Sequence, residues 1–359
     1  MRAAVLREYG EPLAIERIDS PNPDPHGVVV DVEACGICRS DWHAWKGHGE
    51  WADDRVPKGQ ILGHEPAGTV IEAGDRVETV TVGDRIAVPF SVGDGTCPYC
   101  RNGRGNICAD GFAIGFQPEA QGAFAEQVHL PYADYNAIAI PEGFDPVSIA
   151  ALGCRYMTAF HALEHRANVD AGDWIAVHGC GGVGLSAIQL ASALGGRPIG
   201  IDIRTSALER ATALGAVETI DATEEPVVDA IEAITADRPD VRGGADVSID
   251  ALGRAETCLN SIRSLRPGGT HVQLGLTTDE ERGRIELPTD WMTRWEIDFL
   301  GSRGMPPTRY DELFGLIDAS DVDPGDLIAD TVALDAVSDR LAAMDDYGVE
   351  GIEVVTSFE

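Results

Sequence analysis

The sequence has very little lysine and a large shortage of positive charge. Lysine stands only at Lys46 and Lys58, and 27 basic residues face 60 acidic ones, which gives a formal net charge of -33. Nucleic acids and anionic membranes are poor partners for such a chain. Self-repulsion destabilises its compact state in dilute buffer, whereas molar salt, with a Debye length of about 3 Å, removes most of this penalty. We therefore expect a halophilic host; an ordinary acidic protein is the alternative.

Long apolar runs are also missing. No stretch approaches the roughly 20 apolar residues that cross a bilayer, and the N-terminus from Met1 to Val5 lacks the basic patch and apolar run of a signal peptide. These features predict a cytoplasmic protein. In a reducing cytoplasm, the eight cysteines are expected to be metal ligands or inert buried thiols and not disulfides.

The length of 359 residues exceeds what one hydrophobic core usually supports, so two domains are expected. The first part reads as short strands broken by glycine and proline, which is typical of an irregular β-rich domain. Its predicted strands are Val28–Val30, Ala67–Ile71, Arg85–Val88 and Phe124–Val128. After Pro141, apolar residues at helical spacing predict a helix through Ala151, Cys154, Thr158 and Leu163.

Strands and helices alternate in the second part of the chain. The predicted strands are Trp174–Val177, Pro198–Ile201, Asp246–Ile249, His271–Leu274 and Ile297–Leu300. Ser206 and Glu209 have the spacing of a capping box at the start of a helix. This alternation predicts a doubly wound parallel sheet. We expect the remaining stretch to Glu359 to return to the first domain.

A glycine-rich turn follows the strand that ends at Val177. Gly179, Gly181 and Gly184 have G-x-G-x-x-G spacing. Only hydrogen at these positions lets the turn tighten, the backbone approach a pyrophosphate and the next helix pack closely. The flanking strand and helix, with an acidic residue at Asp202, complete a dinucleotide-binding pattern. A purely structural turn is the alternative.

The residues after the second strand bear on the choice of cofactor. Asp202 is expected to bind the adenosine ribose hydroxyls and to repel a 2'-phosphate, which favours NAD. Arg204, two residues later, could reach a 2'-phosphate, so NADP use stays open. As an alternative, Arg204 is a solvated surface charge.

Two groups of potential metal ligands stand out. Cys38, His64 and Cys154 lie in three separated segments and combine two thiolates with an imidazole, a set that catalytic zinc sites use with the fourth position open. The second group is local: Cys97, Cys100 and Cys108, with Asp94 as a possible fourth ligand, predict a structural zinc site. A metal-free loop held by its own packing is the alternative for the second group.

Five motifs occur in order along the chain: G-I-C-x-S-D-x-H at 36–43, G-H-E at 63–65, the cysteine-rich lobe, G-C-x-x-x-T at 153–158 and G-x-G-G-V-G at 179–184. Together they resemble the zinc-containing medium-chain alcohol dehydrogenases, and the resemblance covers essentially the whole chain. It implies a GroES-like, irregular β-rich catalytic domain at 1–155 and 303–359 and a Rossmann domain at 156–302. One departure is that Asp94 replaces the first of the family's four lobe cysteines, which puts the tightness of the second zinc in doubt.

The resemblance assigns roles to individual residues. It implies that Cys38, His64 and Cys154 are the catalytic zinc ligands, with Glu65 as an adjacent carboxylate that ligates transiently. The other positions that match family roles are Asp41, which orients the zinc-bound imidazole; Ser40 and His43, the proton relay; Arg39, near the cofactor pyrophosphate; Gly182 in the glycine turn; Thr158 and Val183, against the nicotinamide; and Phe90, in the substrate pocket. Cys35, Cys180 and Cys258 are expected to be packing residues.

The implied activity is the interconversion of alcohols with aldehydes or ketones, with zinc as Lewis acid and NAD, or NADP, as hydride carrier. The resemblance also implies a homo-oligomer, a dimer or tetramer. A polyol or sugar dehydrogenase is a close alternative, but such enzymes often have glutamate where this chain has Cys154. Zinc-free quinone or enoyl reductases lack Cys38 and His64. A nicotinamide-binding redox sensor without turnover is the alternative from another class.

Overall fold

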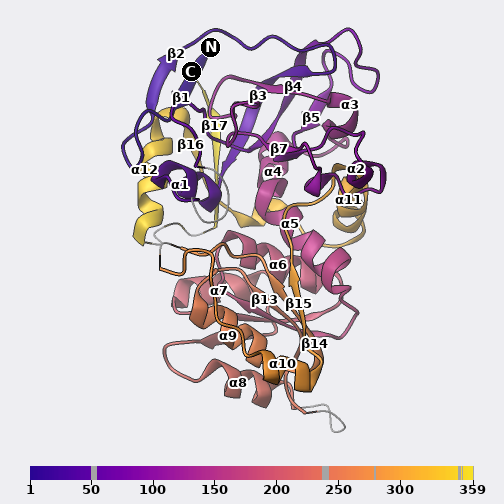
Figure 1. Ribbon diagram of the computed structural model, residues 1–359, viewed down its shortest axis with the longest axis vertical. Helices are drawn as coiled ribbons and strands as arrows, with labels where there is room; N and C mark the ends of the chain where they lie inside the picture. The colour runs from indigo at the N-terminus through magenta and orange to yellow at the C-terminus, as the bar shows by residue number, and fades with distance from the viewer. Residues whose placement is uncertain (50–54, 237–241, 279, 347–348, 350, 359) are drawn as a thin grey trace. The chain divides into compact units, whose positions relative to one another are not determined.

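In the computed structural model, the two ends of the chain fold together and the middle folds as a separate unit (Figure 1). The first unit comprises Met1–Met157, Gly304–Asp318 and Asp323–Glu359, and the second comprises Thr158–Arg303 and Ala319–Val322. The structure describes residues 1–49, 55–236, 242–278, 280–346, 349 and 351–358. No helix in these ranges combines the length and the apolar character that crossing a membrane requires.

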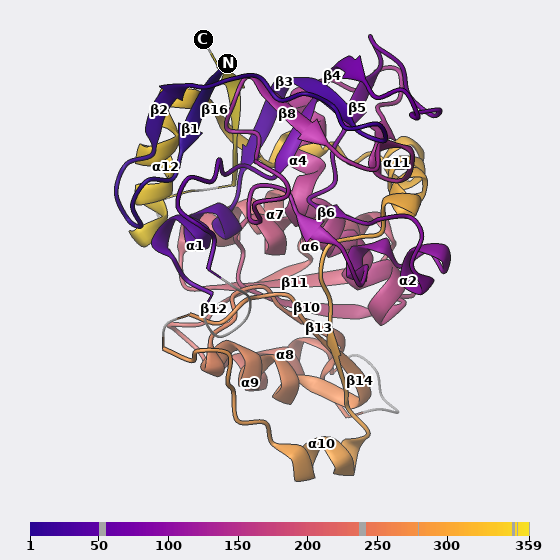
Figure 2. The same ribbon diagram turned by 45° about the horizontal axis from the view of Figure 1, so that its top comes forward.

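The first unit is built around β3 (Val28–Ile37), a strand whose side chains are mostly buried. Its seven-stranded sheet runs in the order β16 (Ile328–Ala333), β17 (Ile352–Ser357), β3, β4 (Glu65–Ala73), β5 (Arg85–Ala87) and β9 (Ile138–Ala139), with β8 (Gln127–Leu130) also paired to β3. Because β17 pairs with β3, the C-terminal stretch joins the sheet of the N-terminal stretch, and both chain ends lie in this unit (Figure 2). The C-terminal stretch thus lies in the same unit as the N-terminal one.

Three of the four predicted strands of this unit lie in β3, β4 and β5. The fourth, predicted at Phe124–Val128, is partly wrong, because β8 begins only at Gln127. The backbone of Phe124 instead bonds two different segments, accepting from the N–H of Ala4 and donating to the carbonyl of Leu62. These bonds replace a continuous ladder to one neighbouring strand.

The helix predicted after Pro141 is also partly wrong. Asp145 caps α4 (Pro146–Ala151) by accepting the N–H groups of Val147 and Ser148. The path then leaves helical geometry at Gly153, where φ is -52° and ψ is -142°. A Cβ at this position would lie 2.5 Å from the Cβ of Glu65. The close approach to β4 requires glycine, and it interrupts the expected continuous helix.

The remaining elements of the first unit are short. They are β1 (Arg2–Val5), β2 (Ala14–Arg17), α1 (Arg39–Lys46), β6 (Ser91–Val92), α2 (Pro98–Arg101), β7 (Phe112–Ala113), α3 (Ala133–Asn136), α11 (Tyr310–Ala319) and α12 (Val337–Ala343). A buried apolar cluster that includes Val28, Val30, Leu62, Phe124 and Val355 holds strands from both chain ends together.

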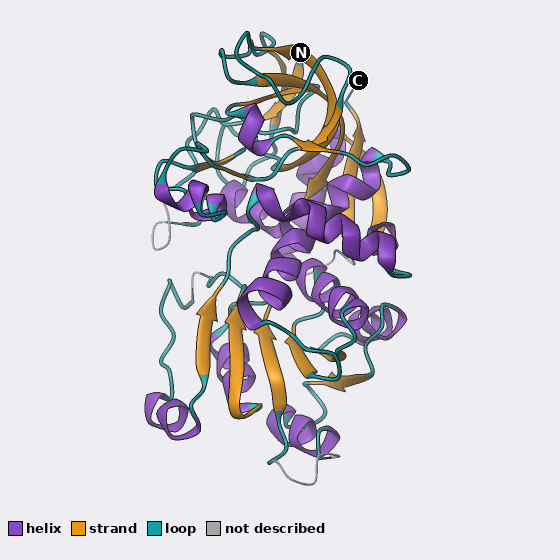
Figure 3. Ribbon diagram, turned by 90° about the vertical axis from the view of Figure 1, so that its right-hand side faces the viewer, coloured by secondary structure: helices purple, strands orange, loops and turns teal. Residues whose placement is uncertain are grey.

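The second unit is the predicted doubly wound parallel sheet, which is confirmed. Its strand order is β12 (Glu218–Asp221), β11 (Arg197–Asp202), β10 (Trp174–His178), β13 (Ala245–Asp250), β14 (Leu265–Gln273) and β15 (Asp298–Gly301), and every pairing is parallel. The connecting helices lie on both faces (Figure 3): α6 (Gly182–Ala193), α7 (Thr205–Ala213), α8 (Val227–Ile234) and α9 (Ala255–Arg263). Both faces are covered, so β10 and β13 are buried along their whole length. A further helix, α10 (Thr289–Trp295), precedes β15.

The capping box predicted at Ser206 and Glu209 is wrong. Helix α7 begins at Thr205 with Arg204 as its N-cap, so Ser206 lies inside the first turn. The Asp202 carboxylate accepts the N–H groups of Ile203 at 2.9 Å and Arg204 at 3.0 Å. This side chain fixes the backbone ahead of the helix, which therefore starts before the position that the local spacing favours.

His178, the last residue of β10, is fully buried. Neither of its ring nitrogens has a hydrogen-bond partner among the described residues. Burial, and secondly the neighbouring His271, lower the pKa of the imidazole to about 3, against 6.5 for an unperturbed histidine. Below pH about 6.5 the unfolded chain therefore binds a proton that the folded chain does not, and stability falls as the pH falls.

We expect His178 to cost the fold roughly 2 kcal/mol between pH 7 and pH 5. Between pH 7 and pH 5, the free energy of unfolding of wild type should therefore fall by roughly 2 kcal/mol more than that of His178→Gln, as measured by urea unfolding. Tryptophan fluorescence followed at several pH values measures both slopes. His26→Gln, the same substitution at an exposed position, supplies the matched control. Identical slopes for His178→Gln and wild type would contradict the assignment.

Candidate active site and metal centres

The sheet and α4 bring four potential metal ligands together in the first unit. Cys38 follows β3, and His64 and Glu65 stand at the start of β4. The antiparallel register pairs Gly36 with Glu65, which places Cys38 beside His64. Helix α4 packs on both strands and delivers Cys154. Each residue offers one ligand atom, and these four atoms all lie within 4.8 Å of one another.

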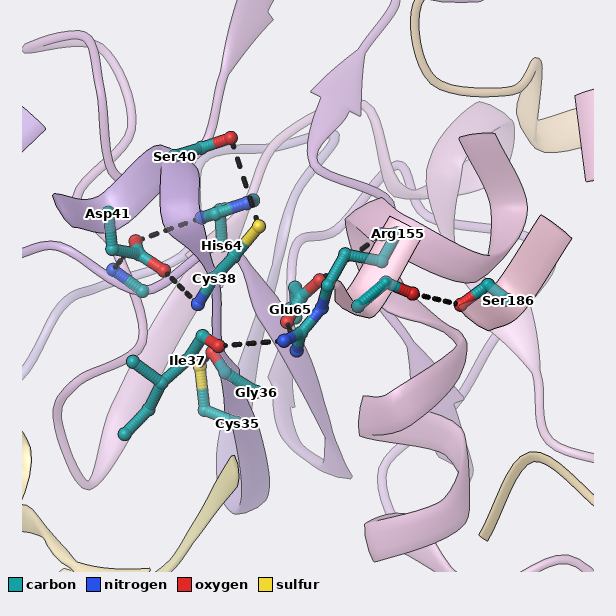
Figure 4. A network of polar contacts seen from close by, with 12 residues as sticks. Cys35, Gly36, Ile37, Cys38, Ser40, Asp41, His64, Glu65, Arg155 and Ser186 are labelled. Carbon is teal, nitrogen blue, oxygen red and sulfur yellow. Dashed lines mark hydrogen bonds and ion pairs between the residues drawn. The ribbon is translucent and has the colours of Figure 1, made fainter. Parts of the chain in front are cut away.

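Asp41 fixes the orientation of His64 (Figure 4). Its Oδ1 accepts from His64 Nδ1 at 2.9 Å and from the Gly63 N–H at 3.0 Å, while Oδ2 accepts from the Cys38 N–H at 2.9 Å. Since a carboxylate only accepts, Nδ1 carries a proton, and the neutral ring then presents the lone pair on Nε2. Nε2 is buried and has no hydrogen-bond partner within the described part of the chain. A buried acceptor without a partner is costly, and a metal ion satisfies it.

Among the three proposed ligands, Cys38 is shifted toward the form that binds a divalent metal. A hydrogen bond from Cys154 lowers the pKa of the Cys38 thiol well below its usual range and outweighs burial, and the thiolate is the form that binds metal. Burial raises the pKa of Glu65 to about 7, although Arg155 opposes the shift. Two sulfurs, one imidazole nitrogen and a nearby carboxylate are ligands that zinc takes at about 2.0 to 2.3 Å. The residues therefore fit a zinc ion.

The remaining predicted residues of this site lie on α1 or against His64. Ser40 Oγ is 3.8 Å from Cys38 Sγ. His43 lies on α1, and its Nδ1 is 3.1 Å from Nδ1 of His48. The Phe90 ring packs edge-on against His64, with 5.8 Å between ring centroids. Arg39, next to Cys38, places its guanidinium 3.8 Å from the centroid of the Trp42 ring.

Two residues near the cluster escaped sequence reasoning. Phe116 packs on His64 with ring centroids 4.7 Å apart, and no motif marks it. Arg155 forms a buried ion pair with Glu65. It occupies a variable position of the G-C-x-x-x-T motif, so its adjacency to Cys154 was the only available signal. The two rings give His64, which is fully buried, an apolar surrounding on that side.

The second ligand group also converges. One ligand atom from each of Asp94, Cys97, Cys100 and Cys108 lies within 4.8 Å of the other three. The Asp94 carboxylate accepts the N–H groups of Cys97 at 3.0 Å and Thr96 at 2.8 Å, and these bonds hold its pKa well below its usual range. The Cys100 N–H lowers the pKa of Cys97 to about 7. An ionised carboxylate and three sulfurs at this spacing fit a second zinc ion.

In the second unit, the predicted cofactor residues gather at the carboxyl end of β10. Gly179 has a φ of +96°, a left-handed conformation that favours glycine. A Cβ at Gly184 would lie 1.8 Å from the Gly179 carbonyl oxygen, whereas one at Gly181 would meet no described atom within 4 Å. The strand order reverses between β10 and β13, and ligands of doubly wound sheets bind at such points.

Asp202 lies directly beside this turn. Its Oδ2 accepts the Cys180 N–H at 2.8 Å, and its Oδ1 lies 3.2 Å from Nε of Arg204. Gly182 and Val183 form the first turn of α6. Thr158, also in this unit, is buried, and its hydroxyl has no partner among the described residues. The glycine turn and the acidic residue thus meet as a dinucleotide site requires.

A β-rich unit with a Cys-His-Cys cluster and a Rossmann unit define the class of zinc-binding dehydrogenases. Comparison with known proteins agrees: the model of the alcohol dehydrogenase GroES-like domain matches residues 24–142, and that of the zinc-binding dehydrogenase matches 182–319. The chain is 32% identical over 361 residues to an NAD-dependent alcohol dehydrogenase of Sulfurisphaera tokodaii, covering 99% of both chains. It is 34% identical over 278 residues to an alcohol dehydrogenase of Geobacillus stearothermophilus, covering 77% of both.

Among solved structures, the alcohol dehydrogenase TADH from Thermus sp. ATN1 superposes with a TM-score of 0.89 at 27% identity, over 99% of this chain and 100% of that one. This chain belongs to the zinc-binding alcohol dehydrogenase family. The GroES-like and Rossmann architecture expected from the sequence is confirmed.

Proposed function

We propose that this chain is a zinc-dependent oxidoreductase that transfers a hydride between an alcohol and NAD(P), interconverting alcohols with aldehydes or ketones. Two observations on His64 carry the proposal: its buried Nε2 has no hydrogen-bond partner among the described residues, and a nitrogen of its ring lies within 4.8 Å of two cysteine sulfurs. Zinc held by Cys38, His64 and Cys154 supplies Lewis-acid chemistry to the substrate oxygen. A small molecule with a hydroxyl or carbonyl group is the substrate.

The protein residues have separate tasks. Asp41 keeps the His64 imidazole in the tautomer that presents Nε2. Ser40, beside Cys38, takes the proton of the substrate hydroxyl as it passes its own proton on along the relay, and His43 returns that proton to solvent. Phe90 and Phe116 give the His64 side of the site an apolar surface, which excludes water and favours apolar substituents on the substrate.

NAD is the preferred cofactor in this proposal. The Asp202 carboxylate beside the glycine turn repels a 2'-phosphate. The positive charge of Arg204, which would attract a 2'-phosphate, pairs with Asp202. Arg39, Thr158 and Val183 complete the set of cofactor contacts. The turn residues Gly179, Gly181, Gly182 and Gly184 hold the pyrophosphate.

The second zinc has a structural task. Asp94, Cys97, Cys100 and Cys108 hold it, and it cross-links the lobe between β6 and β7. A carboxylate in place of a thiolate weakens the site. The hydrogen bonds that Asp94 makes with Cys97 and Thr96 support the loop in addition to the ion.

The host, the location and the assembly are parts of the same proposal. The net charge of -33 supports a halophilic organism, because salt screens its self-repulsion, and the cytoplasm is the proposed location. We place the catalytic domain at 1–155 and 303–359 and the Rossmann domain at 156–302. A dimer or tetramer is supported by β15, which lies at the edge of its sheet and exposes Phe299, because an open edge strand favours pairing with a second copy.

Alcohol oxidation with both cofactors tests the function. Primary, secondary, aromatic and polyhydroxy alcohols are offered with NAD or NADP, in molar potassium chloride and in dilute buffer, and the absorbance of reduced nicotinamide is followed. We expect NAD reduction with simple alcohols, highest in molar salt, and its loss after metal removal by a chelator. Activity confined to polyols would identify a polyol dehydrogenase, and cofactor binding without turnover on any alcohol would identify a sensor.

A further inference from the structure

Each of the three proposed zinc ligands has a sequence neighbour in one shared polar network. Ile37 precedes Cys38, Glu65 follows His64 and Arg155 follows Cys154. Arg155 donates through Nη2 to Glu65 Oε2 at 2.6 Å and through Nη1 to the Ile37 carbonyl at 2.9 Å (Figure 4). The Arg155 backbone N–H lies 3.4 Å from Glu65 Oε1. One residue therefore binds both oxygens of this carboxylate.

The fold is shaped around this ion pair. The side chain of Glu65 is 0% exposed and that of Arg155 is 6% exposed. A Cβ at Gly36 would lie 2.1 Å from Glu65 Oε2, and one at Gly153 would lie 2.5 Å from Glu65 Cβ. Glycines on two different segments thus leave the space that the carboxylate fills. A buried ion pair offsets its desolvation only with good geometry and further hydrogen bonds, and this pair has both.

A zinc ion at this site would compete with Arg155 for the Glu65 carboxylate. One of its oxygens lies within 4.8 Å of the ligand atoms of Cys38, His64 and Cys154. Zinc takes four ligands readily, and a carboxylate binds it at about 2.0 to 2.2 Å. A fourth protein ligand would give the closed coordination of a structural site and would leave no place for a substrate oxygen. The guanidinium of Arg155 and the zinc ion compete for the same oxygens.

We propose that Arg155 is a positioning residue that holds the Glu65 carboxylate away from the metal, so that the fourth coordination place stays open. This inference rests on the proposed function, because it concerns the same metal. Arg155 contributes two donors that are fixed in one plane and bind Glu65 and the Ile37 carbonyl together. The carboxylate is thereby tied to the strand that delivers Cys38.

Cobalt(II) in place of zinc tests the inference without turnover, because its visible absorption reports the coordination geometry. Azide binds at an open place and changes the spectrum, whereas a site with four protein ligands does not respond. We expect wild type to respond and Arg155→Met to bind azide at least about tenfold more weakly. The double variant Arg155→Met with Glu65→Gln should respond again, because the amide competes poorly for the metal.

A matched control replaces a second arginine that pairs with a buried glutamate. Arg340 forms an ion pair with Glu353, whose side chain is 2% exposed. The Arg340→Met variant should keep the wild-type cobalt spectrum and azide response. A lost response in this control would mean that removing such an ion pair disturbs the site only by loosening the fold, which would overturn the specific role of Arg155.

If Arg155→Met does not fold, the single variant Glu65→Gln still tests whether the carboxylate is held away from the metal. The amide keeps a hydrogen bond from Arg155, and a carboxylate that Arg155 holds off the metal in the resting site can be replaced without changing the coordination of that site. We expect the same cobalt spectrum and an azide affinity within about twofold of wild type. A changed spectrum in this variant, or an unchanged azide response in Arg155→Met, would overturn the inference. Failure of wild type to bind cobalt at an azide-responsive place would instead overturn the proposed function.

Discussion

Replacing Cys38 by serine is expected to lower kcat/KM for alcohol oxidation by at least about a thousandfold, because Lewis-acid stabilisation of the reacting oxygen is worth several kcal/mol. Serine removes the thiolate whose pKa is lowered most clearly in the cluster. The glycine turn belongs to the other unit, so NAD binding should persist. Zinc content, steady-state rates and a fluorescence titration with NAD measure the three effects separately.

Cys258 supplies the control for this experiment. It is buried in α9 with 1% of its surface exposed, outside both ligand groups. Cys258→Ser makes the same chemical change in a core position and should retain zinc and turnover. A Cys38→Ser variant that keeps wild-type activity would show that this thiol is not needed, and the metal assignment would then fail.

Gly184→Ala is expected to destabilise the second unit by about 3 kcal/mol or more and to abolish NAD binding. The added Cβ would lie 1.8 Å from the carbonyl oxygen of Gly179. Gly179 lies in the tight turn after β10 and Gly184 in the first turn of α6, so neither residue can move without opening the turn. Urea unfolding and NAD titration measure the two losses.

Gly181→Ala separates cofactor binding from folding. Gly181 caps α6 at a φ of -85°, which alanine adopts, and an added Cβ meets no described atom within 4 Å. The variant should unfold within about 1 kcal/mol of wild type. Its affinity for NAD should fall at least about tenfold, because a methyl group there obstructs the pyrophosphate. Normal NAD binding by Gly181→Ala would contradict the proposed role of the turn, as would wild-type stability of Gly184→Ala.

The fold of the second unit followed from local patterns. Short apolar strands alternate with amphipathic helices, and the glycine turn joins one of each, so neighbouring residues carry the information. Where a local pattern predicted the wrong helix boundary or a continuous helix, a side chain outside that pattern determined the backbone path. At α7 the Asp202 carboxylate fixed the backbone before the predicted capping box, and at Gly153 the approach of Glu65 interrupted a periodic helix.

For the candidate site as well, some features could be predicted from the sequence and others could not. Donor chemistry, two cysteines and a histidine, could be assigned from residue identity, and the G-H-E segment marked Glu65. Glu65 and Arg155 form their pair although they lie 90 positions apart in sequence, and no motif spacing predicts a contact over that separation. Phe116 entered the site because its loop folds back over His64, which again no motif signals.

Sequence by itself determined which atoms can bind zinc and where a dinucleotide turn forms, because these properties depend on side-chain chemistry and on spacings of a few residues. Only the tertiary structure decided that three distant ligands share one place, and that an arginine beside the third holds the neighbouring carboxylate. Those contacts depend on the register of β3 against β4 and on the packing of α4 against both, and many distant residues set these jointly.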